Sequence, residues 1–221
     1  MLLPLFAAAT PGVLPASFYA SAYDNPATPW TTGKPQPAVQ AEQASFQGRV
    51  LDCGCGAGEN SCFLALCKDV TSVTGFDLSP GGVALARDRA LELPPDAAPA
   101  SFFTASAETA ASALLPRQFD TALDSALLHC LADDSARAYV GQLAQLVVPG
   151  GKVYVGCFSD SNPDPWDNPR RLSEAYLRDL FSEEAGFSVE SVREVWWARP
   201  PERGTGGGAF CMAHWMVARR L

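Results

Sequence analysis

Three glycines at alternate positions, preceded by an acidic residue, are the residues of this chain best suited to ligand chemistry. Gly54, Gly56 and Gly58 follow an apolar run that ends at Asp52. The run predicts a buried strand, and the glycines predict a tight turn whose backbone can approach a ligand closely. Apolar residues resume at Phe63, as in the first turns of a helix, whose N-terminus offers free amide donors. The sequence therefore predicts a binding site where this strand meets this helix.

A second acidic residue lies at the spacing that an adenosine ribose requires. The segment 71–78 (TSVTGFDL) predicts another strand, and Asp77 near its end follows Gly58 by 19 residues. A glycine turn after one strand, with an acid closing the next strand about 20 residues later, is the arrangement that holds a ribose by its hydroxyls. The alternative is a flexible glycine turn with two surface acids, which leaves the combined placement of Asp52 and Asp77 unexplained.

The order D-x-G-x-G-x-G over residues 52–58 resembles motif I of the class I S-adenosylmethionine-dependent methyltransferases. Asp77, in the run Gly-Phe-Asp-Leu-Ser, matches the ribose-binding acid of that family. The resemblance implies that the glycine turn passes under the methionine part of the cofactor. It also implies that Asp52 helps to hold the cofactor's amino group, directly or through water. The implied cofactor is S-adenosylmethionine, with S-adenosylhomocysteine as its product.

Other segments resemble a narrower group, the small-molecule methyltransferases related to the thiopurine, thiol and halide enzymes. These segments are 23–37, 119–131, 149–151 and 169–174. In that group an N-terminal Pro-Trp segment folds over the cofactor, and Trp30 matches its tryptophan. The resemblance divides the chain into an N-terminal arm and cofactor lid, residues 1–40, and a class I methyltransferase domain, residues 41–221.

Candidate residues for the rest of the site follow the third and fourth predicted strands. Ala107 and Glu108 lie where the family contacts the adenine, although a first-turn acid that favours the helix dipole is the alternative for Glu108. Asp124 lies near the family's motif IV, with a helix cap as the alternative. His129, one of two histidines, is the one obvious base near neutral pH, and a structural histidine is the alternative.

The predicted site thus consists of catalytic residues and cofactor-binding residues. No metal ligands are predicted, since Cys62 and Cys67 are not at zinc spacing. The predicted catalytic residues are His129 and Asp124. The predicted cofactor-binding residues are Trp30, Asp52, Gly54, Cys55, Gly56, Gly58, Asn60, Asp77, Leu78, Ser79, Ala107, Glu108, Asp124 and Ser125.

The residue types near motif IV favour one class of methyl acceptor. Methyl transfer from a sulfonium is an in-line displacement that needs alignment and a dry site. A soft anion such as a thiolate or halide needs no general base, so the scarcity of acid–base residues favours a thiol or halide acceptor. Oxygen or nitrogen methylation with His129 as base is the alternative.

Two further readings come from other function classes. A nicotinamide-dependent oxidoreductase would need a Tyr-Lys or His-Asp set, and lysine occurs only at positions 34, 68 and 152. A binding module without catalysis would keep the cofactor pocket alone. The complete set of three glycines and two acids argues against a decayed site.

Composition excludes several partners. The net charge of −8 and the absence of basic runs argue against nucleic-acid binding. The seven cysteines, an odd number in mostly apolar runs, indicate reduced thiols in a cytoplasmic enzyme. The apolar start, Met1–Ala9, is too short to cross a bilayer and has no Lys or Arg. We expect a small-molecule acceptor, no membrane partner and a monomer or weak homodimer, with organelle targeting by the arm as an alternative.

The strands and helices that must position these residues are predicted from alternating sequence patterns. These patterns predict an α/β, Rossmann-like, doubly wound single domain of 221 residues with a mostly parallel sheet. By resemblance, the sheet has seven strands and the last is antiparallel. The loop 159–169 carries Trp166 and either lines the acceptor site or packs at the surface, and a glycine-rich turn is expected at 203–208. Expected strands are 49–53, 71–77, 101–105, 119–125, 152–158, 188–197 and 210–219, and expected helices are 60–68, 80–93, 105–113, 133–147 and 173–184.

Overall fold

The computed structural model describes residues 10–24, 28, 30–165, 167–200 and 210–221. The expectations for Met1–Ala9, for Trp166 and for the turn at 203–208 lie outside these residues.

A seven-stranded sheet in the order β3-β2-β1-β4-β5-β7-β6 forms the centre of the molecule. The neighbours from β3 to β5 pair in parallel, whereas β7 runs antiparallel to both β5 and β6. Six strands therefore share one direction and the last is reversed, which confirms the predicted Rossmann-like sheet and the single domain. The strands are β1 (Gly48–Cys53), β2 (Val70–Asp77), β3 (Ala100–Thr104), β4 (Phe119–Ser125), β5 (Val147–Phe158), β6 (Phe187–Ala198) and β7 (Phe210–Arg220).

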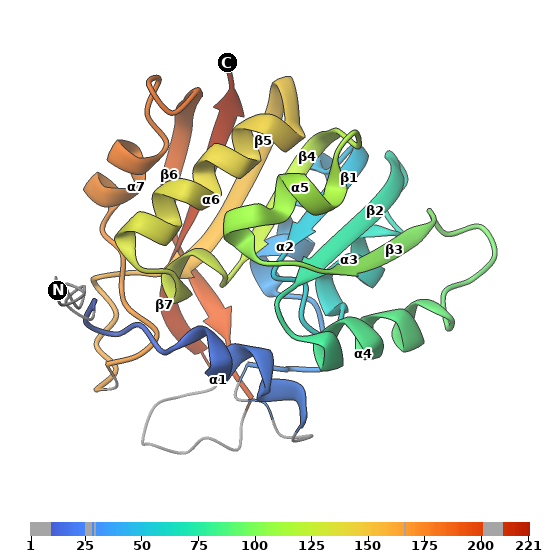
Figure 1. Ribbon diagram of the computed structural model, residues 1–221, viewed down its shortest axis with the longest axis horizontal. Helices are drawn as coiled ribbons and strands as arrows, with labels where there is room; N and C mark the ends of the chain where they lie inside the picture. The colour runs from blue at the N-terminus through green and yellow to red at the C-terminus, as the bar shows by residue number, and fades with distance from the viewer. Residues whose placement is uncertain (1–9, 25–27, 29, 166, 201–209) are drawn as a thin grey trace, which may run out of the picture.

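Helices cover both faces of this sheet (Figure 1). One face carries α5 (Ala110–Leu114), α6 (Asp133–Leu146) and α7 (Glu174–Leu180). The other carries α2 (Pro37–Ala41), α3 (Glu59–Leu64) and α4 (Pro80–Ala90). The short α1 (Ala16–Ala20) lies at the lower edge in Figure 1. Four 3₁₀ turns complete the described elements: η1 (Ala22–Asp24), η2 (Gln43–Ser45), η3 (Ala107–Thr109) and η4 (Leu128–Cys130).

Side chains of the central strands are buried on both faces, which is why these strands read as nearly continuous apolar runs. In β1, Leu51 and Cys53 join the core beneath α5 and α6, whereas Val50 joins the core beneath α2 and α3. Asp52 alternates with them and therefore faces α3, where it meets Ser61. The alternation of the strand thus places an acid inside the core, next to the glycine turn.

Some elements have other bounds than the sequence predicts. The helix α3 ends at Leu64 instead of residue 68, because the next amides bond in tighter, three-residue turns. The helix α7 ends at Leu180 instead of residue 184. The strand β5 begins at Val147 instead of residue 152, so the segment 149–151 lies inside it, next to a shift in the register between β4 and β5. Apolar periodicity identifies an element but does not define its ends.

The described helices include none that is both long and apolar enough to cross a membrane.

Candidate functional site

The predicted glycine turn joins β1 to α3 and has the backbone conformation that only glycine adopts easily. Gly54, Gly56 and Gly58 have φ values of 67°, 53° and 80°, in the left-handed region. A Cβ atom added at Gly54 would lie 3.0 Å from the Cβ of Leu127, and one at Gly58 would lie 3.0 Å from the Cβ of Ala86. Backbone conformation and close packing therefore both require glycine here.

Asp77, at the end of β2, is fixed against this turn. Its Oδ2 accepts a hydrogen bond from the amide of Gly56 at 2.9 Å, and its Oδ1 accepts one from the amide of Ser79 at 2.8 Å. Burial raises the pKa of this carboxyl, and these amides oppose the shift. Each carboxylate oxygen can accept a second hydrogen bond, so the fixed acid still has lone pairs for the hydroxyls of a ligand.

Ser79 and Leu78 belong to the same corner. The Oγ of Ser79 accepts a hydrogen bond from the amide of Gly82 at 3.3 Å and caps α4. Leu78, between Asp77 and the cap, is half-buried. Ser79 therefore has a structural role, whatever else contacts it.

Asp52 carries a buried oxygen that lacks a partner. It is 1% exposed, and its Oδ2 accepts a hydrogen bond from the Oγ of Ser61 at 2.5 Å. Its Oδ1 has no hydrogen-bond partner among the described residues. Burial, with lesser repulsion from nearby acids, raises the pKa of Asp52 to about 7. A buried acceptor without a partner is costly, so this oxygen is suited to a donor supplied by a ligand.

The N-terminal arm covers the glycine turn through an aromatic pair. The Nε1 of Trp30 donates a hydrogen bond to the hydroxyl of Tyr23 at 2.8 Å, and the ring centroids lie 6.2 Å apart. That hydroxyl occupies the space that a side chain at Gly56 would need, and a Cβ atom at Gly82 would lie 3.0 Å from the Tyr23 ring. Tyr23 is missing from the predicted site residues, although it begins the arm segment that carried the narrower resemblance.

Asn60 ties the arm to the sheet. Its Nδ2 donates to the Oγ of Ser125 at 2.9 Å, and its Oδ1 accepts from the amide of Gln36 at 3.0 Å. The side chain of Gln36 is buried and exchanges two hydrogen bonds with the backbone of Ala198, at 3.1 and 3.0 Å. Asn60 and Ser125 therefore join the turn, the end of β4 and the arm.

Asp124 holds the turn that follows β4. Its Oδ1 accepts hydrogen bonds from the amides of Leu127 and Leu128 at 2.9 and 3.2 Å, around Ala126 with its φ of 75°. Its side chain is fully buried, and burial raises its pKa to about 6. These contacts give Asp124 a structural role in the turn before η4, as in the alternative that the sequence left open, although the N-cap residue itself is Leu127.

His129 is poorly arranged to act as a base. It is 2% exposed, and its Nδ1 accepts a hydrogen bond from the amide of Phe158 at 3.0 Å. Burial, and then the positive charge of Arg170, lower its pKa to about 3. One ring nitrogen is thus engaged with backbone, and the imidazole holds a proton weakly.

The residues that follow β3 lie beside Asp77, because the amide of Ala105 donates to the carbonyl of Asp77 at 2.9 Å. Ala107 is buried and Glu108 is exposed. The amide of Glu108 donates to the Oγ of Ser106 at 3.3 Å, which caps η3. Cys55, inside the glycine turn, is buried against Gly75.

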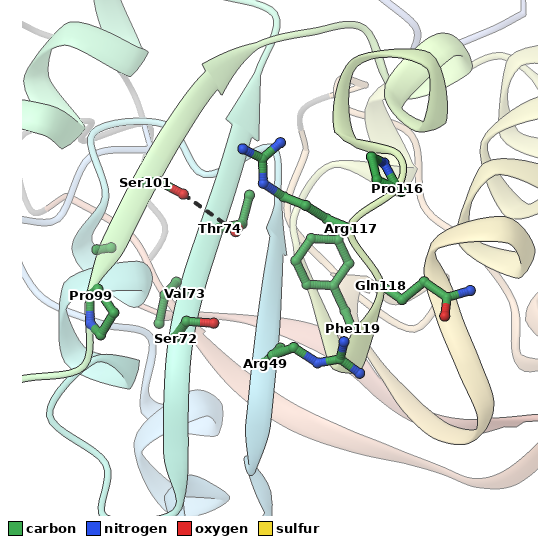
Figure 2. Close-up of a pocket in the computed structure, with 11 residues that line it drawn as sticks. Arg49, Ser72, Val73, Thr74, Pro99, Ser101, Pro116, Arg117, Gln118 and Phe119 are labelled. Carbon is green, nitrogen blue, oxygen red and sulfur yellow. Dashed lines mark hydrogen bonds between the residues drawn. The ribbon is translucent and has the colours of Figure 1, made fainter.

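A hollow of about 410 Å³ lies at the opposite end of the sheet, at the amino ends of the strands (Figure 2). Arg49 and Arg117 line it together with hydroxyls that include Thr74 and Ser101, 3.4 Å apart. None of the predicted site residues lines it. Ligands of open α/β sheets bind outside the carboxyl ends, so the site is at the other edge.

Within the described part of the chain, no three His, Cys, Asp or Glu side chains are grouped so as to hold a metal ion.

Comparisons with known proteins point to one family. The model of the methyltransferase domain family matches residues 50–151. A 2-heptyl-1-hydroxyquinolin-4(1H)-one methyltransferase from Mycobacteroides abscessus is 30% identical over 162 residues, which make up 70% of this chain. The match spans 66% of that relative's length, just under two thirds.

Solved structures share the fold over nearly the whole chain. One, which concerns the conversion of a disulfide bond into a thioacetal group during echinomycin biosynthesis, is 30% identical, with a TM-score of 0.76 over 93% of this chain and 92% of that one. The 1,6-didemethyltoxoflavin-N1-methyltransferase from Burkholderia thailandensis is 21% identical, with a TM-score of 0.64 over 93% of this chain and 86% of that one. The second likeness shows the fold alone.

Proposed function

Since the chain belongs to the class I S-adenosylmethionine-dependent methyltransferases, we propose that it transfers a methyl group to a small-molecule acceptor at the carboxyl edge of its sheet. The observation that carries this proposal is the unit formed by the glycine turn and Asp77, with the orphaned oxygen of Asp52 beside it. The glycine turn would pass under the methionine part of the cofactor, Asp77 would bind the ribose, and Asp52 would bind the amino group.

Each polar group of the cofactor has a suitable partner in this chain. Asp77 keeps lone pairs for the ribose hydroxyls. The Oδ1 of Asp52 would accept from the amino group, directly or through water, which would remove an unsatisfied buried acceptor. We assign the adenine to the side of Leu78, Ala107 and Glu108. The remaining assignments are Trp30, Gly54, Cys55, Gly56, Gly58, Asn60, Ser79, Asp124 and Ser125.

S-adenosylmethionine supplies an electrophilic methyl group on its sulfonium. The acceptor's lone pair forms the new bond to the methyl carbon as the bond from that carbon to sulfur breaks, and S-adenosylhomocysteine leaves. The protein's part is alignment and exclusion of water. The pair of Tyr23 and Trp30 lies over the glycine turn, where it would both align the cofactor and exclude water. We therefore propose that residues 1–40 act as an arm and lid for the domain at 41–221.

We propose a soft, anionic acceptor such as a thiol or halide. Its support is the environment of His129, because no proton needs to be removed from such an acceptor during transfer. The two relatives at 30% identity are named for a hydroxyquinolone and for a disulfide that becomes a thioacetal. One name concerns sulfur chemistry and the other a hydroxyl, and neither concerns a halide.

The alternative is methylation of a neutral hydroxyl or amine with His129 as base. The engaged Nδ1 and the low pKa of His129 argue against it, because a catalytic base works best with a pKa near the operating pH. The free cysteines, seven in all, support a reducing compartment such as the cytoplasm. We propose a monomer or weak homodimer there.

Calorimetric titration with S-adenosylmethionine and S-adenosylhomocysteine, followed by an assay of S-adenosylhomocysteine release over thiols, halides, phenols and amines, tests this function. We expect binding of both nucleosides, and turnover with thiols above all. Binding without turnover on any acceptor would favour a binding module. Binding of a nicotinamide cofactor instead would favour the oxidoreductase class.

A further inference from the structure

We propose that Arg170 binds the methyl acceptor as an anion and so replaces a general base, an inference that rests on the proposed methyltransferase function. The acceptor class that follows is a small molecule whose nucleophilic sulfur or oxygen is acidic, such as an aromatic thiol or an acidic hydroxyl on an aromatic ring. Neutral amines do not belong to this class.

Arg170 is held in one orientation by two side chains. Its Nη1 donates to the Oδ1 of Asp133 at 2.6 Å, and its Nη2 donates to the hydroxyl of Tyr176 at 2.8 Å. That hydroxyl donates in turn to the same oxygen of Asp133 at 2.8 Å. The guanidinium carbon lies 5.0 Å from the centre of the Tyr176 ring. Each outer nitrogen thus has one N–H engaged, and the guanidinium cannot turn without breaking these bonds.

The third nitrogen of Arg170, Nε, is the one that makes no hydrogen bond to the described residues. This nitrogen is also buried. The Arg170 side chain is 11% exposed, whereas that of Asp133 is 46% exposed. Water therefore screens the carboxylate more than the guanidinium, which leaves part of the positive charge unscreened on the buried side of the pair. A dehydrated N–H of a cation binds an anionic oxygen or sulfur more strongly than a neutral one.

Arg170 lies next to the segments that border the predicted acceptor position. The amide of Leu172 donates to the carbonyl of Phe158 at 2.9 Å, and that of Asp160 donates to the carbonyl of Leu172 at 3.2 Å, so the segment of Arg170 runs beside the end of β5. On the other side, Asp133 begins α6 directly after η4, which carries His129. We call η4, the end of β5 and the side chains of Asp133, Arg170 and Tyr176 the acceptor half.

The other titratable groups around Arg170 do not compete for the role. Asp133 and Tyr176 hold the guanidinium, and His129 is neutral and bonded to backbone. Burial raises the pKa of Cys130 to about 12 and raises that of Cys157 as well, so both thiols stay protonated. Arg170 is therefore the one cation of this set, and its Nε lies on the side away from the bonds to Asp133 and Tyr176 that its outer nitrogens make.

The chemical consequence concerns the acceptor's ionisation. A cation within about 4–6 Å lowers the pKa of an acid by about 1–3 units. An acceptor bound at the Nε of Arg170 would release its proton to solvent on binding, and its lone pair would then form the bond to the methyl carbon. The site needs no residue to take the proton during transfer.

The test is the pH dependence of kcat, which reports ionisation in the enzyme–substrate complex, for an alkyl thiol and an aryl thiol in the wild type and in three variants. Arg170→Gln removes the charge, Arg170→Lys keeps it, and Asp133→Asn removes its counter-ion. For the alkyl thiol we expect the midpoint of the rise with pH to move up by about one unit in Arg170→Gln and down in Asp133→Asn. Arg170→Lys should recover part of the loss.

The aryl thiol and a distant arginine supply the controls. An aryl thiol is more fully ionised at neutral pH, so Arg170→Gln should reduce its kcat at neutral pH less than that of the alkyl thiol. Arg117→Gln, at the amino edge, should leave both midpoints in place. Equal losses for both thiols with unmoved midpoints would overturn the proposal and make Arg170 a structural residue. If Arg170→Gln does not fold, an unmoved midpoint in Asp133→Asn overturns it alone. A wild type that binds no S-adenosylmethionine would refute the proposed function instead, so the two failures are distinguishable.

Discussion

The two halves of the carboxyl edge are built in different ways. The cofactor half consists of the glycine turn at 54–58, Asp77 and the lid pair Tyr23 and Trp30, and most of it comes from one strand-turn-helix-strand stretch. The acceptor half draws its groups from separate elements, with Asp133, Phe158 and Arg170 brought together by tertiary contacts. The cofactor half is therefore formed mostly by residues close in sequence, and the acceptor half depends on the completed fold.

Their polar groups differ as well. In the cofactor half, Asp77 is bonded to two backbone amides, and the neighbouring Asp52 has one oxygen without a partner among the described residues. In and around the acceptor half, the Nε of Arg170, the hydroxyl of Tyr19 and the Oδ2 of Asp124 are buried without hydrogen-bond partners among the described residues. Satisfied groups hold a shape, whereas a buried group without a partner can take one from a ligand or a water molecule.

The largest effect is expected at the acid that anchors the cofactor half. Asp77→Ala removes hydrogen bonds to a charged group, worth about 1.5–3 kcal/mol each, and should raise the Kd for S-adenosylmethionine about 100-fold. Calorimetric titration measures it. The control Arg117→Gln, at the amino edge, should change Kd by less than about twofold. An unchanged Kd in Asp77→Ala would show that Asp77 does not bind the ribose.

A smaller change in affinity, with a pH-dependent change in stability, is expected at Asp52. Its pKa of about 7 exceeds its usual 3.8, so the native state binds this proton more tightly than the unfolded state does. Stability therefore falls as pH rises from about 4 to about 7 and stays lower above that. Asp52→Asn should raise Tm by about 2–4 °C for each kcal/mol recovered at pH 8, and by less at pH 5.

The same variant should weaken S-adenosylmethionine binding about tenfold, the loss of one charge-assisted hydrogen bond. Thermal denaturation at both pH values and titration of the cofactor give the two readings. A gain in Tm that is the same at pH 5 and pH 8 would show that the carboxyl of Asp52 does not titrate between them.

The next effect concerns His129 in the acceptor half. His129→Gln keeps an acceptor for the amide of Phe158, so we expect kcat to fall by less than about tenfold, whereas loss of a general base removes about 10²–10⁴-fold. The pH profile of kcat should also keep its shape, because a group with a pKa of about 3 does not titrate near neutrality. A loss of a thousandfold together with a lost acid limb would restore His129 as the base.

The smallest effect is expected at the lid. Tyr23→Phe removes the hydroxyl that accepts from Trp30 but keeps the ring over the glycine turn. The Kd for S-adenosylmethionine should rise about threefold, as expected for one neutral hydrogen bond. Tyr19→Phe, in α1 of the same arm, is the matched control and should leave Kd unchanged. An equal rise in both variants would indicate a general loosening of the arm.

The comparison also explains what the sequence could predict. The glycine turn, Asp52 and Asp77 are within about 30 residues of each other, and their spacing reflects fixed strand and turn geometry. The alternating strand and helix patterns predicted the mostly parallel sheet, and the family resemblance predicted its antiparallel last strand. The end of α3 at Leu64 was not predicted, because local three-residue turns decide it. Arg170 lies in the segment 169–174, which carries the narrower resemblance but assigns this arginine no role, and only its bonds to Asp133 and Tyr176, 37 and 6 residues away, point to one.

For Asp124 and His129, the sequence predicted the position but not the hydrogen bonds. Their position at the end of β4 was predictable, but the amides that Asp124 binds and the amide that His129 accepts from depend on Ala126 and Phe158. Residue type and position suggest chemistry, whereas burial and hydrogen bonding decide whether a side chain is free to perform it.

The most direct test of the whole account is a turnover experiment with S-adenosylmethionine that carries a deuterated methyl group and an aromatic thiol as acceptor. Mass spectrometry of the small-molecule products reads the result. The account predicts a thioether that carries the intact deuterated methyl group, together with an equal amount of S-adenosylhomocysteine. S-adenosylmethionine bound but left unconsumed in the presence of every acidic thiol and hydroxyl offered would contradict it.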